Sequence, residues 1–153
     1  MRSALAVLLV LLNGGPVLAC TCVETGLLTR LRGSPDVFVA RLLSVRQSAR
    51  VAVPKGAVVR VVVVESWKGV RPGQILDIAT GSGGGDCGYD FEGDLARGDS
   101  IHLVFARPVP KKRALLTTDI CDSKPLRWAR VERDSLNRWK ALGVIAPIPR
   151  DSV

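Results

Sequence analysis

This sequence has few of the residues on which zinc sites and membrane spans depend. Its 153 residues include a single histidine, His102, and only four cysteines. A structural zinc site usually has a Cys-x2-4-Cys pair on each side of the metal. Here one pair has a single intervening residue, and the other two cysteines stand alone. We therefore expect no structural zinc site. After residue 19 no segment approaches roughly 18 uninterrupted apolar residues, so no later membrane span is expected.

Recognisable catalytic motifs are also missing. Ser82 does not lie in a Gly-x-Ser-x-Gly elbow, because position 80 is threonine. The glycine-rich run 81–85 lacks the Gly-Lys-Ser/Thr ending of a phosphate-binding loop. We therefore expect no enzyme, and we interpret His102 as a structural strand residue. Some acidic residues could form pairs, although acidic residues near turns are usually only solvated: Asp77, Asp86, Asp90, Glu92 and Asp99.

The N-terminus has the organisation of an export signal. Met1 and Arg2 form a minimal positive region, and Ala4 to Leu12 is an apolar run that is too short to span a bilayer. Val17-Leu18-Ala19 offers permitted residues before a cleavage site. We predict a signal peptide over residues 1–19, so that the mature chain begins with Cys20.

All four cysteines lie after this cleavage site: Cys20, Cys22, Cys87 and Cys121. An even number of cysteines in an exported domain predicts two disulfides and a secreted or periplasmic location. One alternative stays open, because Leu18-Ala19-Cys20 also resembles a bacterial lipobox, which would make the protein an outer-membrane lipoprotein. Against it, Val17 and Leu18 fit the lipobox poorly, and a thioether at Cys20 would leave one other cysteine unpaired.

The formal net charge is +8. Export separates the chain from nucleic acid, and its basic residues are scattered rather than interleaved with aromatic ones. We expect a basic surface that can adhere to an anionic envelope surface, and no nucleic-acid partner.

The middle of the chain has the pattern of a β-domain. The run from Val58 to Val64 is rich in β-branched residues, which favour strands. Residues 47–56 and 68–73 are typical of loops and turns, and a further loop ends at Cys87. The expected strands are 36–45, 57–67, 75–80, 100–106 and 114–118.

After Cys121 the apolar residues recur at helical spacing: Trp128, Val131, Ser135, Leu136, Trp139 and Leu142. We expect Asp122 or Ser123 to cap this helix, with Pro125 in the first turn, and Gly143 to end it. Both tryptophans are expected in the core, and residues 144–153 are expected to form a loose tail. Five strands and a terminal helix fit one mainly β domain over residues 20–143, a five-stranded OB-type Greek-key barrel.

An ordered set of segments resembles the tissue inhibitors of metalloproteinases, whose inhibitory domain is an OB-type, netrin-like barrel. Cys20-Thr21-Cys22-Val23 is similar to the mature N-terminus of that family. The likeness covers most of residues 20–143 and suits a single-domain bacterial member. The other similar segments are Asp36 to Arg41, Trp67-Lys68-Gly69, Cys87-Gly88-Tyr89, Leu116 to Cys121, and Arg127 to Gly143.

The resemblance implies two disulfides, Cys20–Cys87 and Cys22–Cys121. These are two of the three bridges of the animal inhibitory domain; the third is absent because the region of Arg32 offers no cysteine.

The resemblance also implies an inhibitory ridge made of Cys20, Thr21, Cys22 and Val23. The free amine and the carbonyl of Cys20 would chelate the catalytic zinc of a target metalloendopeptidase. Thr21 would enter the pocket that receives the residue after the scissile bond. The chain would have no metal or cofactor of its own and would contact the protease zinc in trans. The alternative is a non-inhibitory binding or envelope module on the same fold.

Overall fold

In a computed structural model, the described residues are 20, 22–23, 25–48, 56–81, 87–110 and 112–146. The expected signal peptide, the ridge residue Thr21, Ser82, Asp86 and the last seven residues of the expected tail, 147–153, lie outside the described residues.

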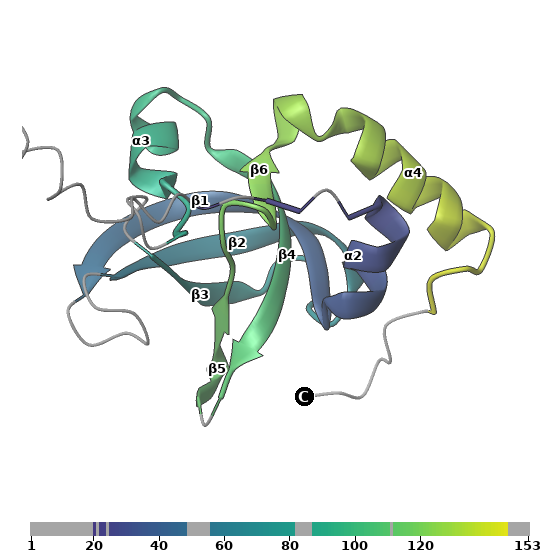
Figure 1. Ribbon diagram of the computed structural model, residues 1–153, viewed down its shortest axis with the longest axis horizontal. Coiled ribbons are helices and arrows are strands. Elements are labelled where there is room, and N and C mark those ends of the chain that lie inside the picture. Colours follow the sequence, from purple (N-terminus) through teal and green to yellow (C-terminus); the bar gives the residue numbers. More distant parts are fainter. Residues whose placement is uncertain are drawn as a thin grey trace, which may run out of the picture.

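Over the described residues the fold is mainly β, with three α-helices and a short 3-10 helix around a sheet (Figure 1). The strands are β1 (Asp36–Ser48), β2 (Gly56–Lys68), β3 (Ile75–Thr80), β4 (Ile101–Val109), β5 (Lys112–Thr117) and β6 (Ser123–Pro125). The helices are α2 (Leu27–Gly33), α3 (Phe91–Ala96), the 3-10 helix η1 (Leu126–Trp128) and α4 (Arg130–Ala141).

The six-stranded mixed sheet closes into a ring of five strands. Its order is β1-β2-β3-β5-β4-β6, and β1 also pairs with β4, which closes the ring. The β3–β5 pair is parallel and the other pairs are antiparallel. Register shifts in β1, the last between Leu42 and Ser44, bend the strand. Bending allows β1 to pair with β2 along its length while residues 36–41 also pair with β4.

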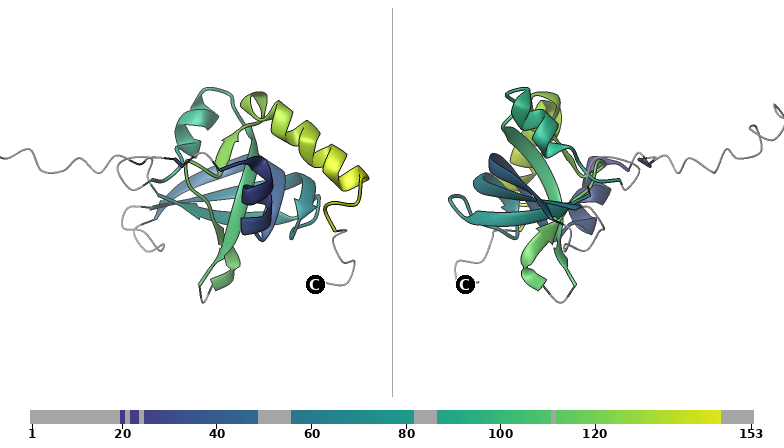
Figure 2. Two further views of the ribbon diagram at one scale, coloured as in Figure 1. Left: turned by 45° about the vertical axis from the view of Figure 1, so that its right-hand side comes forward. Right: turned by 90° about the vertical axis from the view of Figure 1, so that its left-hand side faces the viewer.

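Successive side chains of β1 point to opposite faces of the sheet, and this divides the core into two parts. Phe38 and Ala40 point into a cluster inside the ring, whereas Val37 and Val39 point to the opposite side. That second cluster also contains Leu31 of α2 and Leu136 of α4, so both helices cover the same side of the sheet. In the left view of Figure 2, α4 runs above α2, and α3 lies apart from α2, on the chain segment that precedes β4.

The five expected strands are all present, with ends displaced by a few residues. The start of the C-terminal helix was predicted wrongly, because α4 begins at Arg130 and neither Asp122 nor Ser123 caps it. Ser123 instead belongs to β6 and pairs with Val104, so sheet pairing outweighs its capping preference. The predicted end is confirmed, since Gly143 has φ +71° just after the helix.

Two further expectations need correction. Trp128 is 67% exposed rather than in the core, because it lies in η1, before α4 begins; Trp139 does pack against the core. The short helices α2 and α3 were not anticipated, since each has seven residues or fewer and too little length to reveal a period.

Candidate functional site: the N-terminal ridge and its two anchors

Two disulfides connect the N-terminal ridge, defined as residues 20–23, to the rest of the domain. They join Cys20 to Cys87 and Cys22 to Cys121, with Cα–Cα distances of 5.3 and 5.4 Å. These are the pairs that the family resemblance implied. Because all four cysteines are oxidised, none is available as a thiolate ligand for a metal. Two disulfides indicate an oxidising, extracytoplasmic location.

The described part of the ridge lies at the protein surface. Cys22 is exposed and Val23 is 80% exposed, while Cys20 is half-buried. After the ridge the chain leads directly into α2, drawn in purple in Figure 1. A partner could therefore contact this segment. Two disulfides hold it in place through cysteines that are only two residues apart.

The first anchor is the segment 87–90, which carries Cys87 and connects β3 to α3. The Tyr89 N–H donates a 2.7 Å hydrogen bond to the Thr80 hydroxyl at the end of β3. Gly88 is buried so closely against the chain that a Cβ atom there would lie 2.0 Å from the carbonyl carbon of Gly81. Only glycine fits this approach, and the contact fixes the segment against the end of β3.

A buried polar network attaches the first anchor to the core. The Tyr89 hydroxyl donates to the Asp94 carboxylate at 2.6 Å, and His102 Nε2 lies 2.8 Å from the same oxygen. Arg97 bonds the other Asp94 oxygen at 2.5 Å. Asp94 is 5% exposed and His102 is fully buried. Three donors thus converge on one carboxylate, which connects the Cys87 segment, α3 and β4.

The network fixes the protonation of its members. Burial alone would raise the pKa of Asp94, but hydrogen bonds from His102, Tyr89 and Arg97 outweigh it and lower the pKa. Burial lowers the pKa of His102, and Asp94 offsets this only in part. A neutral His102 must therefore carry its hydrogen on Nε2, because an ionised carboxylate can only accept. Burial first, and then the bond to Asp94, raise the pKa of Tyr89.

The second anchor is the turn that carries Cys121, between β5 and β6. The Asp119 carboxylate accepts hydrogen bonds from the N–H groups of Cys121 and Asp122, at 2.9 and 3.2 Å. The buried Thr118 hydroxyl lies 3.0 Å from the Phe105 carbonyl, to which it donates, and 2.8 Å from the Ser123 hydroxyl. This anchor is supported by a turn and by neutral hydroxyls.

The two anchors are in direct contact. The Ile120 N–H donates a 3.1 Å hydrogen bond to the Cys87 carbonyl. Both disulfides therefore attach the ridge to a single platform, which is held by β3 on one side and β4 on the other.

Two surface hollows, of about 550 Å³ and about 470 Å³, lie among the residues that the structure describes. The smaller of these adjoins the ridge, and its walls include Val23, Arg30 and Glu132. The Arg30 guanidinium lies 4.1 Å from the centre of the Phe105 ring, and its Nε is 3.5 Å from Asp122. Lys124 forms an ion pair with Glu132. This hollow combines both signs of charge beside the exposed ridge.

Each of the four acidic candidates that the structure describes has a separate structural partner, and Asp86 lies outside the described residues. Asp77 binds Arg60 at 2.9 Å, a contact that lowers the pKa of Asp77. The others have separate structural partners: Asp90 caps α3 through Gly93 N–H, Glu92 accepts from Gln47, and Asp99 lies 2.5 Å from Arg127.

Asp94 is the site residue that sequence reasoning missed. Its only sequence signal is the spacing of three from Phe91, which places both on the buried face of α3. Over the described ranges, no group of three or more potential metal ligands comes together. No helix in this part of the chain is long and apolar enough to cross a membrane.

Comparison of the sequence with protein-family models and with curated proteins finds no match.

Proposed function

We propose that the protein is an exported inhibitor of zinc metalloendopeptidases, built on an OB-type, netrin-like barrel. The observation that supports this proposal is the attachment of an exposed segment, beginning at Cys20, to one platform by two disulfides. The five-strand ring is compatible with the small barrel that the resemblance implies.

The chemistry requires cleavage after Ala19, so that Cys20 carries a free α-amine. Such an amine has a reference pKa of about 7.7–8.0, so a useful fraction is neutral and able to ligate zinc at neutral pH. A catalytic zinc keeps one coordination position open for water or substrate. The Cys20 amine and carbonyl would occupy that position together and displace the catalytic water.

Pre-organisation gives the ridge its advantage over a free peptide. Ordering a flexible segment opposes binding, and the two bridges remove most of this cost in advance. Thr21 would enter the pocket for the residue after the scissile bond. Val23, which is 80% exposed, would continue along the cleft as a substrate-like contact.

The decisive experiment compares protein that begins at Cys20 with protein carrying one extra alanine before it. We expect the first to inhibit at least one member of a panel of purified zinc endopeptidases. The extended protein should lose inhibition by at least about 100-fold, since a secondary amide cannot ligate the metal as an amine does. Both proteins should have the same melting temperature. Equal potency would rule out chelation by the Cys20 amine.

The alternative function is a non-inhibitory envelope module anchored by a lipid on Cys20. The lipobox-like Leu18-Ala19-Cys20 favours it, whereas the Cys20–Cys87 disulfide opposes it because a thioether would occupy the same sulfur. Mass spectrometry of the native N-terminus separates the two functions. An unmodified Cys20 amine together with two intact disulfides supports the inhibitor, and a diacylglyceryl adduct supports the anchored module.

A further inference from the structure

Large apolar side chains at the start and just past the end of α4 are exposed to solvent. Val131 is 78% exposed and Leu142 is 70% exposed, and Trp128 in the preceding η1 is 67% exposed. Positions 131, 135, 138 and 142 share one helix face by their spacing, while Leu136 on the opposite face is fully buried. This face is mixed, because Ser135 and Arg138 lie between Val131 and Leu142. Three large apolar side chains that are all exposed and close in the sequence suggest a binding surface.

Basic side chains outnumber acidic ones in and around α4. Residues 126–146 contain five basic and two acidic side chains. Arg127 pairs with Asp99 and also lies over the Trp128 ring, 5.1 Å from its centre. Arg130 and Arg138 form no ion pair with any residue that the structure describes. The face therefore combines an exposed indole with guanidinium groups that are free to bind an anion.

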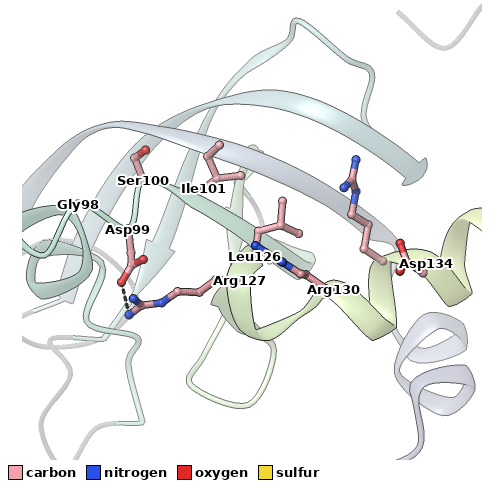
Figure 3. Close-up of a pocket in the computed structure, with 9 residues that line it drawn as sticks. Gly98, Asp99, Ser100, Ile101, Leu126, Arg127, Arg130 and Asp134 are labelled. Carbon is pink, nitrogen blue, oxygen red and sulfur yellow. Dashed lines mark ion pairs between the residues drawn. The ribbon is translucent and has the colours of Figure 1, made fainter.

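A hollow of about 550 Å³ opens beside the start of α4 (Figure 3). Ser100 and Ile101 at the start of β4 form one wall, and Leu126 and Arg127 form the other. Figure 3 shows Arg127 reaching toward Asp99 at one end of the hollow, with Arg130 behind Leu126. The hollow is lined by two apolar side chains, three arginines and two aspartates, Asp99 and Asp134, so its formal charge is +1. A single net positive charge beside apolar side chains suits an acidic head group joined to an apolar body.

We propose that this face, consisting of Trp128, Val131, Arg130, Arg138 and Leu142, docks on a bilayer surface that contains anionic lipids. Trp128 and Val131 enter the boundary between head groups and acyl chains, where indole rings are favoured. Arg130 and Arg138 pair with lipid phosphates, and the hollow receives a neighbouring head group. This surface is independent of the inhibitory proposal and of any lipid on Cys20. The exposed apolar side chains favour a membrane over a soluble polyanion, which would need only the charge.

The test uses exported protein with an unmodified Cys20 and vesicles of phosphatidylcholine, with or without phosphatidylglycerol. We expect co-sedimentation with the anionic vesicles and little with the neutral ones. Acyl chains brominated near the head group should quench the fluorescence of Trp128, because Trp67 is only 1% exposed and Trp139 is half-buried. A Trp128→Phe variant should lose most of this quenching while it still binds.

Substitutions separate the charge from the apolar contribution. Arg130→Gln should weaken binding to anionic vesicles about fivefold, since a basic residue near such a surface contributes on the order of 1 kcal/mol. Val131→Ser should also weaken binding. The matched controls are Arg46→Gln on β1 and Ile75→Ser on β3, whose side chains are similarly exposed at 61% and 62%.

The controls should bind as the unmodified protein does. Equal binding to both kinds of vesicle, absence of Trp128 quenching, or equal losses in the controls and the α4 variants would each overturn the proposal. Stronger binding to soluble sulfated polysaccharide than to vesicles would overturn it in favour of a polyanion partner.

Discussion

The two anchors of the ridge perform the same task with different chemistry. The Cys87 anchor depends on a buried, ionised carboxylate that accepts from Tyr89, Arg97 and His102. The Cys121 anchor depends on a turn held by the half-buried Asp119 carboxylate and on the buried, neutral hydroxyl of Thr118. The Cys87 anchor is therefore held by buried side chains that titrate. The buried side chains that hold the Cys121 anchor are neutral hydroxyls.

This difference has an energetic consequence. A buried carboxylate is stable only while its donors remain, and the loss of one member leaves the others desolvated and unpaired. A neutral hydroxyl that loses its partner costs less. The Cys87 anchor should therefore be stronger when intact and more sensitive to substitution and to acid.

Removal of a disulfide should have the largest effect, and a similar one at both anchors. The bridges span sequence separations of 67 and 99 residues. In the chain-entropy model each contributes about 4–5 kcal/mol, because loop-closure entropy grows only slowly with length. Urea unfolding of the Cys20→Ser/Cys87→Ser and Cys22→Ser/Cys121→Ser proteins should show comparable losses. If removal of only one bridge lowered the free energy of unfolding, the expectation that both bridges stabilise the fold equally would be wrong.

Asp94→Ala should have the next largest effect. It leaves the Tyr89 hydroxyl, the His102 N–H and Arg97 without their acceptor, at a cost of about 3 kcal/mol. The matched control is Asp119→Ala at the other anchor, which removes a more exposed turn contact and should cost about 1 kcal/mol. Urea unfolding measures both. Asp94→Ala should also speed reduction of Cys20–Cys87 by dithiothreitol, relative to Cys22–Cys121. Equal destabilisation by the two substitutions would contradict the comparison.

Thr118→Val tests the neutral anchor with a side chain of nearly the same shape. The hydroxyl contacts both the Phe105 carbonyl and the Ser123 hydroxyl, so its loss should cost about 1–2 kcal/mol. Unfolding of Thr118→Val, Ser123→Ala and the double variant forms a cycle that isolates the coupling between the two hydroxyls. The rate of Cys20–Cys87 reduction should stay unchanged, and an increase would show that the anchors do not act separately.

Much of the fold can be read from the sequence because its strands have strong local signals. The β-branched run in β2 and the short strand β3 were placed within a residue of their ends. The start of α4 could not be placed, since Ser123 and Pro125 suit a helix start as well as they suit β6. Pairing with β4, a contact between distant residues, decides between these outcomes.

The candidate site could also be predicted only in part from the sequence. The two disulfides could be expected from an even number of exported cysteines, and their pairing came from the family resemblance. The supports of the anchors could not be expected, because Asp94 and Thr118 gain their roles only when β4 is brought beside them. The outward position of Trp128 was missed for a related reason. Its spacing fits the helix, but the chain is still in η1 at that residue.

Acidification should have the smallest effect and should act first on the Cys87 anchor. Burial lowers the pKa of His102 from its ordinary value of 6.5. Below that value the unfolded chain gains a proton that folded His102 does not accept, so the free energy of unfolding falls with pH until the folded group is also protonated. Asp94, whose pKa is also lowered, adds a further loss only below about 3.8. Urea unfolding at about pH 7.5 and about pH 5.5 should show this decline, and His102→Gln should reduce it. Hydrogen exchange should show the Tyr89 amide loosening before that of Thr118, and simultaneous loosening would mean that the two anchors share a single response to pH.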